Sequence, residues 1–303
     1  MIMKKFIIRL FIFFLLIVIC DFIFGKSMNY IINHIEVGGQ ARDNHICNKA
    51  TEDILIFGSS RAANHYNSQM IEDSIGLTCY NCGESGSGTI LSYGRLLMVK
   101  ENHHPRIIIK DVNPSFDVNE DDNTRYLGWL KARYERDNIP VIFDMIDPLE
   151  RYKMLCKSYR YNSRFLQNVF VFLTGISFDA GIKGFKPSHV EFDTMKVKKN
   201  PKYEVFKIDT LKLKFINKFI EESKDCKLYF VVSPIWYGMD TIKTTPIRDI
   251  CIKSNIPFLD YSNDPKYVHN NYYFRDGTHL NARGANEFTK DLIMELRKRK
   301  VFE

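Results

Sequence analysis

The stretch Asp53-Ile-Leu-Ile-Phe-Gly-Ser-Ser-Arg61 decides the fold of this chain of 303 residues. A short apolar run that ends at a glycine is typical of a strand buried on both faces of a parallel sheet. The serines that follow stand at the carboxyl end of that strand, where open parallel sheets place their ligands. The stretch therefore predicts a buried parallel strand with a candidate site directly after it.

Helix and strand patterns alternate along the chain on both sides of this stretch. A helix is predicted over 67–76, with Asn67 as its cap and Gly76 at its end. Short apolar runs predict the remaining strands, at 77–80, 106–112, 227–232 and 256–260. Further helices are predicted over 90–99, 211–222, 246–254 and 282–299, the last capped by Asn281. Strands that alternate with helices predict an α/β fold with a parallel sheet.

The alternation lapses after the third predicted strand. From Asn113 to about Thr210 the chain is rich in aromatic residues and has helical stretches such as 148–173. Because the pattern then resumes, we interpret residues 114–210 as an insertion in a single domain over 51–303. A polar connector at 27–50 joins this domain to an N-terminal segment at 1–26.

The N-terminal segment is predicted to be a membrane helix. Lys4 and Lys5 precede an apolar stretch over 6–24 that is interrupted only by Arg9 and Asp21. About 20 apolar residues span the roughly 30 Å of hydrocarbon in a bilayer. The absence of a following small-residue cleavage site favours an uncleaved signal anchor over a cleaved signal peptide. The basic start is expected in the cytoplasm, which places the domain outside it, in the periplasm or at the cell surface.

Charge and cysteine spacing exclude other classes of function. The 43 Lys and Arg exceed the 36 Asp and Glu by seven, and the N-terminal segment and Arg297-Lys-Arg-Lys300 account for that excess. No nucleic-acid partner is therefore expected. Cys79 and Cys82 have the spacing of a redox motif, but they lie at a strand end rather than a helix start. No group of His and Cys has metal-ligand spacing, so neither a metal nor another cofactor is expected.

Three residues at predicted strand ends and loops suit nucleophilic catalysis. Ser60 follows the first strand, where its hydroxyl is exposed and its own N–H can face a developing oxyanion. His279 is a suitable base for that hydroxyl. Asp276 lies three residues before His279, close enough along the chain to hold its imidazole ring. We therefore predict that Ser60, His279 and Asp276 act together.

Other residues are candidates for the surroundings of this group. Gly86 and Asn113 follow the second and third strands, and each could donate a hydrogen bond to the oxyanion beside the Ser60 N–H. Asn113 has an alternative role as the cap of a turn before Pro114. Arg61 is expected either to bind an anionic or glycan group of the substrate or to form a structural salt bridge.

In these blocks the chain resembles the SGNH, or GDSL-like, hydrolases, a family named for Ser, Gly, Asn and His. The resemblance covers roughly 53–113 and 227–299. It implies a three-layer α/β/α sandwich around a five-stranded parallel sheet in the flavodoxin-like order. It also implies roles: Ser60 as nucleophile, His279 as base, Asp276 as its partner, and Gly86 and Asn113 as oxyanion-hole donors.

Two blocks depart from the family pattern. Gly58-Ser-Ser60 stands in place of Gly-Asp-Ser, as in the membrane-anchored branches that resemble DltD-type and alginate-acetylation proteins. Asp111-Val-Asn-Pro114 stands in place of Gly-x-Asn-Asp. The most specific match is Asp276-Gly-Thr-His279 with the Leu-Asn-Ala-Arg-Gly-Ala run that follows it.

The resemblance and the predicted anchor together give the functional hypothesis. We expect a serine esterase that acts on acyl esters, acetyl above all, of extracytoplasmic glycans through an acyl-enzyme on Ser60. An O-acyltransferase that modifies a cell-surface polysaccharide is the near alternative, and it would call for a membrane-bound acyl-transfer partner. A non-catalytic glycan-binding or assembly protein is another, because a fold alone does not establish activity.

Overall fold

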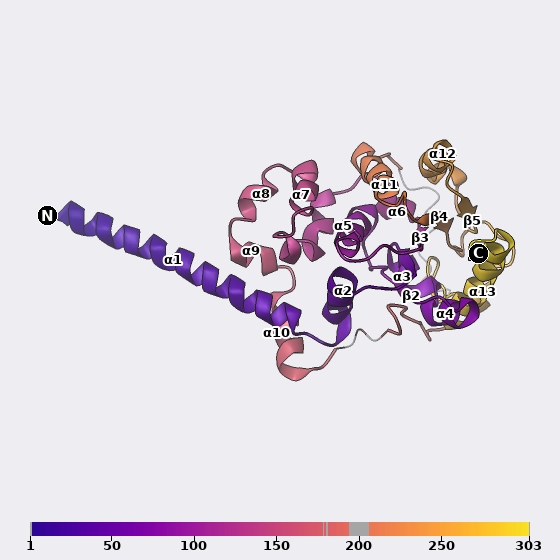
Figure 1. Ribbon diagram of the computed structural model, residues 1–303, viewed down its shortest axis with the longest axis horizontal. Coiled ribbons are helices and arrows are strands. Elements are labelled where there is room, and N and C mark those ends of the chain that lie inside the picture. Colours follow the sequence, from indigo (N-terminus) through magenta and orange to yellow (C-terminus); the bar gives the residue numbers. More distant parts are fainter. Residues whose placement is uncertain (1, 178, 180, 194–205, 303) are drawn as a thin grey trace. The chain divides into compact units, whose positions relative to one another are not determined.

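The short apolar runs form one parallel sheet of five strands (Figure 1). The strands lie in the order β2-β1-β3-β4-β5, so the predicted α/β fold with its flavodoxin-like sheet is confirmed. In the central register Ile54 pairs with Cys79 on one side and Ile107 on the other. The strands are β1 (Ile54–Phe57), β2 (Cys79–Asn81), β3 (Ile107–Asp111), β4 (Lys227–Val232) and β5 (Phe258–Asp260).

Helices flank the sheet and bury its strands. On one face Ile54, Ile109 and Val231 pack in a cluster with Phe288 of α13. On the other face the ring of Phe57 meets that of Phe219 of α11 edge to face at 5.5 Å. The helices around the sheet are α3 (Ser60–His65), α4 (Ser68–Ile75), α5 (Thr89–Lys100), α6 (Pro114–Asp117), α11 (Thr210–Glu222), α12 (Thr245–Lys253) and α13 (Ala282–Lys298). Short 3₁₀ helices occur at Asn123–Trp129, Lys131–Arg133, Thr241–Lys243 and Asn271–Tyr273.

The predicted helix caps are present. The Asn67 side chain accepts a hydrogen bond from the N–H of Met70 at 3.1 Å. The Asn281 side chain accepts one from the N–H of Gly284 at 3.0 Å. Helix α4 ends at Gly76, whose φ of 76° lies in the left-handed region that glycine adopts without a Cβ clash.

A buried ion pair holds α6 against the sheet. Lys110 of β3 lies 3.1 Å from the Asp117 carboxylate, and both side chains are almost fully buried. The Lys110 ammonium also donates to the carbonyl of Asp111 at 2.9 Å. The other oxygen of Asp117 accepts from the N–H of Asn113 at 2.6 Å. The pair therefore fixes the turn that carries Asn113 at the carboxyl edge of the sheet.

The chain divides into two compact units. One consists of Met1–Asn44 with Leu127–Asp179, and the other, which holds the sheet, of His45–Tyr126 with Ala180–Glu303. The structure describes residues 2–177, 179, 181–193 and 206–302, so the part of the predicted insertion at 194–205 lies outside the described residues.

The first unit joins the N-terminal helix to much of the insertion. Helix α1 (Ile2–Asn33) continues past the expected end at Lys26, and this extension and α2 (Gly38–Asn48) together occupy most of the expected connector. The long helical stretch predicted at 148–173 is instead three short helices. The helices of the insertion are α7 (Pro140–Ile146), α8 (Glu150–Lys153), α9 (Lys157–Tyr161) and α10 (Phe165–Thr174).

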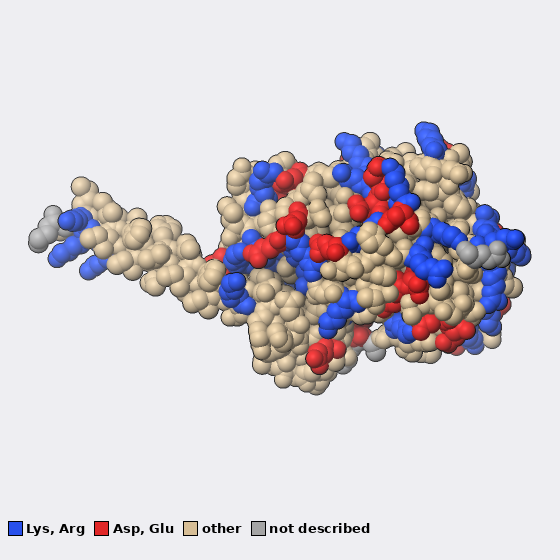
Figure 2. Space-filling view, viewed as in Figure 1, with Lys and Arg blue, Asp and Glu red and all other residues tan. Residues whose placement is uncertain are grey.

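Helix α1 is long and apolar enough to cross a membrane, as judged by length and composition. Its apolar window is 0% buried within the protein. Figure 2 shows this stretch as uncharged side chains, with blue Lys and Arg side chains near its start. The helix is compatible with a membrane anchor or with a signal sequence.

The Lys110–Asp117 pair gives a test of the fold. Replacing Asp117 by Asn leaves the Lys110 charge buried without its counter-ion, so we expect a loss of about 3–5 kcal/mol in the free energy of unfolding. Urea unfolding of the full-length chain in detergent measures this change in the free energy of unfolding. The exposed Asp122→Asn is the control, with an expected change within about 0.5 kcal/mol. A Lys110→Met/Asp117→Leu double variant should regain most of the loss, and a cost below about 1 kcal/mol for Asp117→Asn would contradict this account.

Candidate active site

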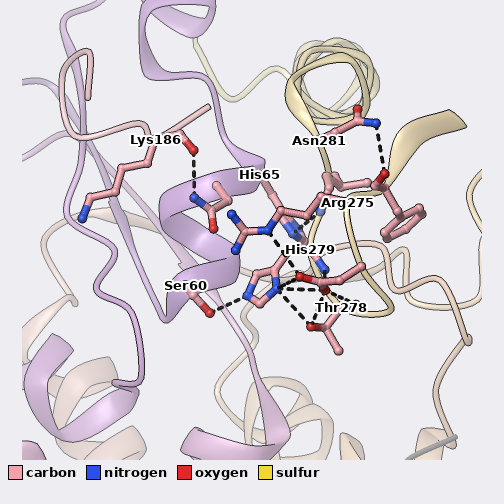
Figure 3. A network of polar contacts seen from close by, with 11 residues as sticks. Ser60, His65, Lys186, Arg275, Thr278, His279 and Asn281 are labelled. Atoms are coloured by element: carbon pink, nitrogen blue, oxygen red, sulfur yellow. Dashed lines mark hydrogen bonds and ion pairs between the residues drawn. The ribbon is translucent and has the colours of Figure 1, made fainter. Parts of the chain in front are cut away.

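The sheet brings the predicted serine, histidine and aspartate into one hydrogen-bonded series. Figure 3 shows the Ser60 and His279 side chains of this series pointing toward one another. Ser60 is the first residue of α3, directly after β1, whereas Asp276 and His279 lie in the loop before α13. The Ser60 Oγ atom is 2.8 Å from Nε2 of His279. Nδ1 of His279 is 3.0 Å from each carboxylate oxygen of Asp276. The structure therefore places all three side chains as a nucleophile, a base and its partner require.

The turn after β1 explains the Gly-Ser-Ser sequence. The Ser59 hydroxyl caps α3 by accepting a hydrogen bond from the N–H of Arg61 at 3.3 Å. A Cβ atom on Gly58 would lie 2.7 Å from that of Ala62 and 3.0 Å from that of Asp111. Only glycine therefore lets the strand turn so closely into the helix, and this turn presents Ser60.

The loop that carries His279 is held by Asp276 and Gly277. One Asp276 oxygen accepts from the N–H groups of Thr278 at 2.8 Å and His279 at 2.9 Å. A Cβ on Gly277 would come 2.1 Å from a ring carbon of Tyr237, so the loop packs against that ring only with glycine there. Asp276 and Gly277 thus hold the fold of the loop itself.

Electrostatics keep the Asp276 carboxylate ionised. Burial alone would raise the pKa of Asp276, but the hydrogen bond and charge of His279, with the N–H of Thr278, lower this pKa well below its usual 3.8. Asp276 is therefore ionised at neutral pH and only accepts hydrogen bonds, so Nδ1 of a neutral His279 carries the proton. Nε2 is then free to accept the proton of the Ser60 hydroxyl.

A second histidine, which the sequence analysis missed, joins α3 to the His279 loop. Nε2 of His65 accepts a hydrogen bond from the N–H of Leu280 at 3.0 Å, so its Nδ1 must carry the proton that it donates to Ser233 Oγ at 2.9 Å. Burial and the charge of Arg61 lower the pKa of His65 well below its usual 6.5. The ring therefore stays neutral and holds both segments in place. The sequence signal that could have identified His65 was its position only five residues after Ser60, on the same short helix.

Arg61 lies inside the protein beneath the site. It is 2% exposed and donates through Nε to Ser233 Oγ at 3.1 Å and through Nη2 to the Ser233 carbonyl. Its Nη1 has no hydrogen-bond partner among the described residues, and Arg61 also lines the cavity beside Ser60. Arg61 thus ties α3 to the end of β4 through hydrogen bonds, and a contact with substrate stays a prediction.

The two expected oxyanion donors differ in their placement. Asn113 caps α6, as its alternative role predicts, by accepting from the N–H of Ser115 at 3.2 Å. Its amide nitrogen donates to the Ser59 hydroxyl at 3.1 Å, and the residue lines the cavity. Gly86 is exposed with a φ of 69° and is not among the described residues that line the cavity. The structure thus brings Asn113 to the site, whereas the role of Gly86 stays a prediction.

A cavity of about 280 Å³ opens beside Ser60 and His279. The loop after β4, which the sequence analysis left without a role, forms much of its wall with Ile235, Met239, Asp240 and Lys243. The signal was available, because this loop also follows a strand at the carboxyl edge of the sheet. The remaining wall comes from Pro114, Ser115, Phe116, Gly238 and Thr278.

The thiols of Cys79 and Cys82 are poorly suited to nucleophilic catalysis. Cys79 is buried, and burial raises the pKa of its thiol well above the usual value, which disfavours a nucleophilic thiolate. Cys82 is buried as well. Within the described ranges, no three His, Cys, Asp or Glu side chains lie close enough together to hold a metal ion.

Comparison with known proteins shows only distant likeness. No family model and no curated protein matches the chain. A Bacteroides fragilis protein for which acylhydrolase activity has been proposed aligns over 86% of this chain and 96% of its own, with 10% identity and a TM-score of 0.43. A family two carbohydrate esterase from Clostridium thermocellum aligns over 84% and 67%, with 8% identity and a TM-score of 0.39. An acetyl xylan esterase from Butyrivibrio proteoclasticus aligns over 82% and 64%, with 9% identity and a TM-score of 0.36. The activity must therefore be argued from the site itself.

The Asp276–His279 contact gives a test of the site. In Asp276→Asn the amide can donate to Nδ1 and favour the wrong tautomer of His279, so we expect phosphonylation of Ser60 to slow by about 10²- to 10⁴-fold. Mass spectrometry of the Ser60 peptide after timed exposure to a fluorophosphonate measures the rate. Asp225→Asn is the matched control, because Asp225 contacts the exposed His104 at 2.6 Å. Equal rates in the two variants would show that Asp276 does not set the tautomer.

Proposed function

We propose that this protein is a serine esterase that forms an acyl-enzyme on Ser60. The observation that carries the proposal is the series from Ser60 Oγ through the His279 ring to the Asp276 carboxylate, with contacts of 2.8 Å and 3.0 Å. The cavity of about 280 Å³ beside Ser60 gives an ester room to approach the hydroxyl.

The geometry suggests the order of the steps. Ser60 Oγ attacks the ester carbonyl carbon while Nε2 of His279 takes its proton, and Asp276 stabilises the imidazolium that forms. The imidazolium then protonates the departing alcohol, which leaves the acyl group on Ser60. A water molecule, deprotonated by His279, attacks this acyl-enzyme; the imidazolium then returns the proton to Ser60 Oγ as the bond to Ser60 breaks and the carboxylic acid leaves. The Ser60 N–H and the Asn113 amide, with the Gly86 N–H, are the proposed donors to the oxyanion.

The proposed substrate is a short acyl ester, acetyl above all, of a glycan outside the cytoplasm. The cavity lies at the small end of ligand pockets, which run from roughly 300 to 1,000 Å³, and this size supports a short acyl group. Asp240, Lys243 and Ser115 on the wall supply polar partners for a polyhydroxylated alcohol. Helix α1, with Lys4 and Lys5 at its start, supports anchoring with the domain on the extracytoplasmic side.

Hydrolysis of p-nitrophenyl acetate by the full-length chain in detergent tests the mechanism. Ser60→Ala and His279→Ala should each lower the rate by at least about 10²-fold, because each removes a member of the reacting series. The exposed Ser74→Ala and His104→Ala are the matched controls and should keep the wild-type rate. A wild type no faster than Ser60→Ala, with Ser60 also inert to fluorophosphonate, would contradict the proposal and favour a glycan-binding protein.

The acceptor of the acyl group is tested separately. An esterase should release one acetate for each p-nitrophenol, and added acetyl-free oligosaccharide should not lower that yield. Mass spectrometry of the oligosaccharide and an acetate assay measure both products. Acetyl groups found on the sugar in place of free acetate would instead favour the O-acyltransferase alternative, since both reactions share the acyl-enzyme.

A further inference from the structure

Polar contacts tie the insertion to the apolar stretch of α1. The Asp21 carboxylate accepts hydrogen bonds from the N–H groups of Lys157 at 2.7 Å and Ser158 at 2.8 Å, at the start of α9. One helical turn further along α1, a Cβ on Gly25 would lie 2.6 Å from that of Lys157. A carboxylate that caps α9 and a glycine that allows its close approach therefore fix α9 against α1.

These contacts set the depth of α9 in a membrane that α1 crosses. With Lys5 at one boundary and a rise of 1.5 Å per residue, Asp21 lies about 24 Å along the helix axis. The hydrocarbon is about 30 Å thick, so Asp21 falls a few ångströms inside the boundary on the far side. A carboxylate at that depth needs partners, and the α9 N–H groups supply them. The start of α9 therefore belongs at the edge of the hydrocarbon.

The insertion presents exposed leucines at this level. Leu155 is 74% exposed and lines an apolar groove together with residues from Phe13 to Phe24 of α1. Leu166 is 78% exposed, and the ring of its neighbour Phe165 lies 5.4 Å from that of Phe24. If water surrounded the protein at this depth, both leucine side chains would be exposed to it, which is unfavourable. If lipid surrounds it there, both side chains are buried.

The side chains around these leucines suit the membrane–water boundary. Tyr152 and Leu149, on the turn before Leu155, are 64% and 63% exposed. Lys26 stands just past the apolar stretch of α1, with its ammonium 5.7 Å from the centroid of the Phe22 ring. Tyrosine and lysine are typical of this boundary, because each has an apolar body and a polar end that reaches water.

The sequence of α1 favours lipid over another helix as the neighbour in this groove. Residues 6–24 contain no Gly, Ala, Ser or Thr. Helices that associate in membranes use such small residues to bring their backbones close. On the α1 side the groove is instead lined mostly by large apolar side chains such as Phe13, Leu16 and Ile17, which suit flexible acyl chains.

We propose that residues 149–166 form a second membrane-contacting element beside α1. Leu155 and Leu166 insert among the acyl chains of the leaflet nearer the C-terminal end of α1, and Asp21 holds α9 at that depth. The inference rests on the anchoring part of the proposed function and is independent of the chemistry at Ser60.

Photolabelling in vesicles tests this inference. The full-length chain is reconstituted in phosphatidylcholine vesicles that contain a phospholipid with a diazirine in its acyl chain, and labelled residues are mapped by mass spectrometry. We expect label on α1 and on residues 149–166, including Leu155 and Leu166. Ile242 and Ile252, which are 65% and 69% exposed in the other unit, are the internal controls and should remain unlabelled.

Each other outcome has a distinct meaning. Label on α1 without label on 149–166 would overturn the inference and leave the anchor intact. A chain without label on α1 would instead contradict the anchor. If residues 149–166 escape the lipid probe and a bifunctional chemical cross-linker joins them between two chains, a second copy is the occupant and the lipid assignment is overturned.

Substitution of the leucines gives the matched comparison. A Leu155→Glu/Leu166→Glu variant should carry at least about ten-fold less lipid label on residues 149–166 than the wild type, because charged side chains withdraw from hydrocarbon. Its label on α1 and its rate with p-nitrophenyl acetate should stay at the wild-type level, which shows that the chain is folded. Ile252→Glu is the control and should label as the wild type does. Undiminished labelling of the double variant would overturn the inference.

Discussion

The hydrogen bond between Ser60 and His279 joins residues that are 219 positions apart, and only the parallel sheet brings them together. Ser60 is placed by the turn from β1 into α3, and His279 by the loop that leads into α13. Helix α13 in turn packs on the sheet through Phe288, in the cluster that includes Ile54 of β1. The site therefore depends on the apolar core, because any shift between α13 and the sheet would change the distance between the hydroxyl and the imidazole.

A layer of buried polar groups lies between that core and the site. Tyr66 donates to Asp111 at 2.7 Å, and burial raises the pKa of Asp111. His65 and Arg61 both donate to Ser233, and each comes from the helix that begins at Ser60. Buried polar groups are costly unless they are paired, so few arrangements of these segments allow the contacts that these groups make. The layer thus holds Ser60 and the His279 loop in one relative position, which apolar packing alone would specify less sharply.

Local signals made the strands, the caps and the core of the site predictable. Asn67, Gly76 and Asn281 act within one turn of their own helix, and Asp276 reaches His279 within its own loop. His65 and the loop after β4 depend on partners far away in the chain, so the sequence alone did not show their roles. Helix α3 has six residues, too few for a periodic pattern to predict it. Residues 27–33 are polar enough to suggest a connector, yet Met28 and Ile32 extend α1 by packing with Tyr161.

The capping of α9 by Asp21 bears on how the chain can be processed after synthesis. A protease cut at Lys26 would remove Asp21 and Gly25 together. The N–H groups of Lys157 and Ser158 would then lose the carboxylate that they contact, and Phe165 would lose the ring of Phe24 beside it. Maturation by loss of a leader would therefore damage the fold of the part that remains. The N-terminal helix is thus built into its unit as a structural member.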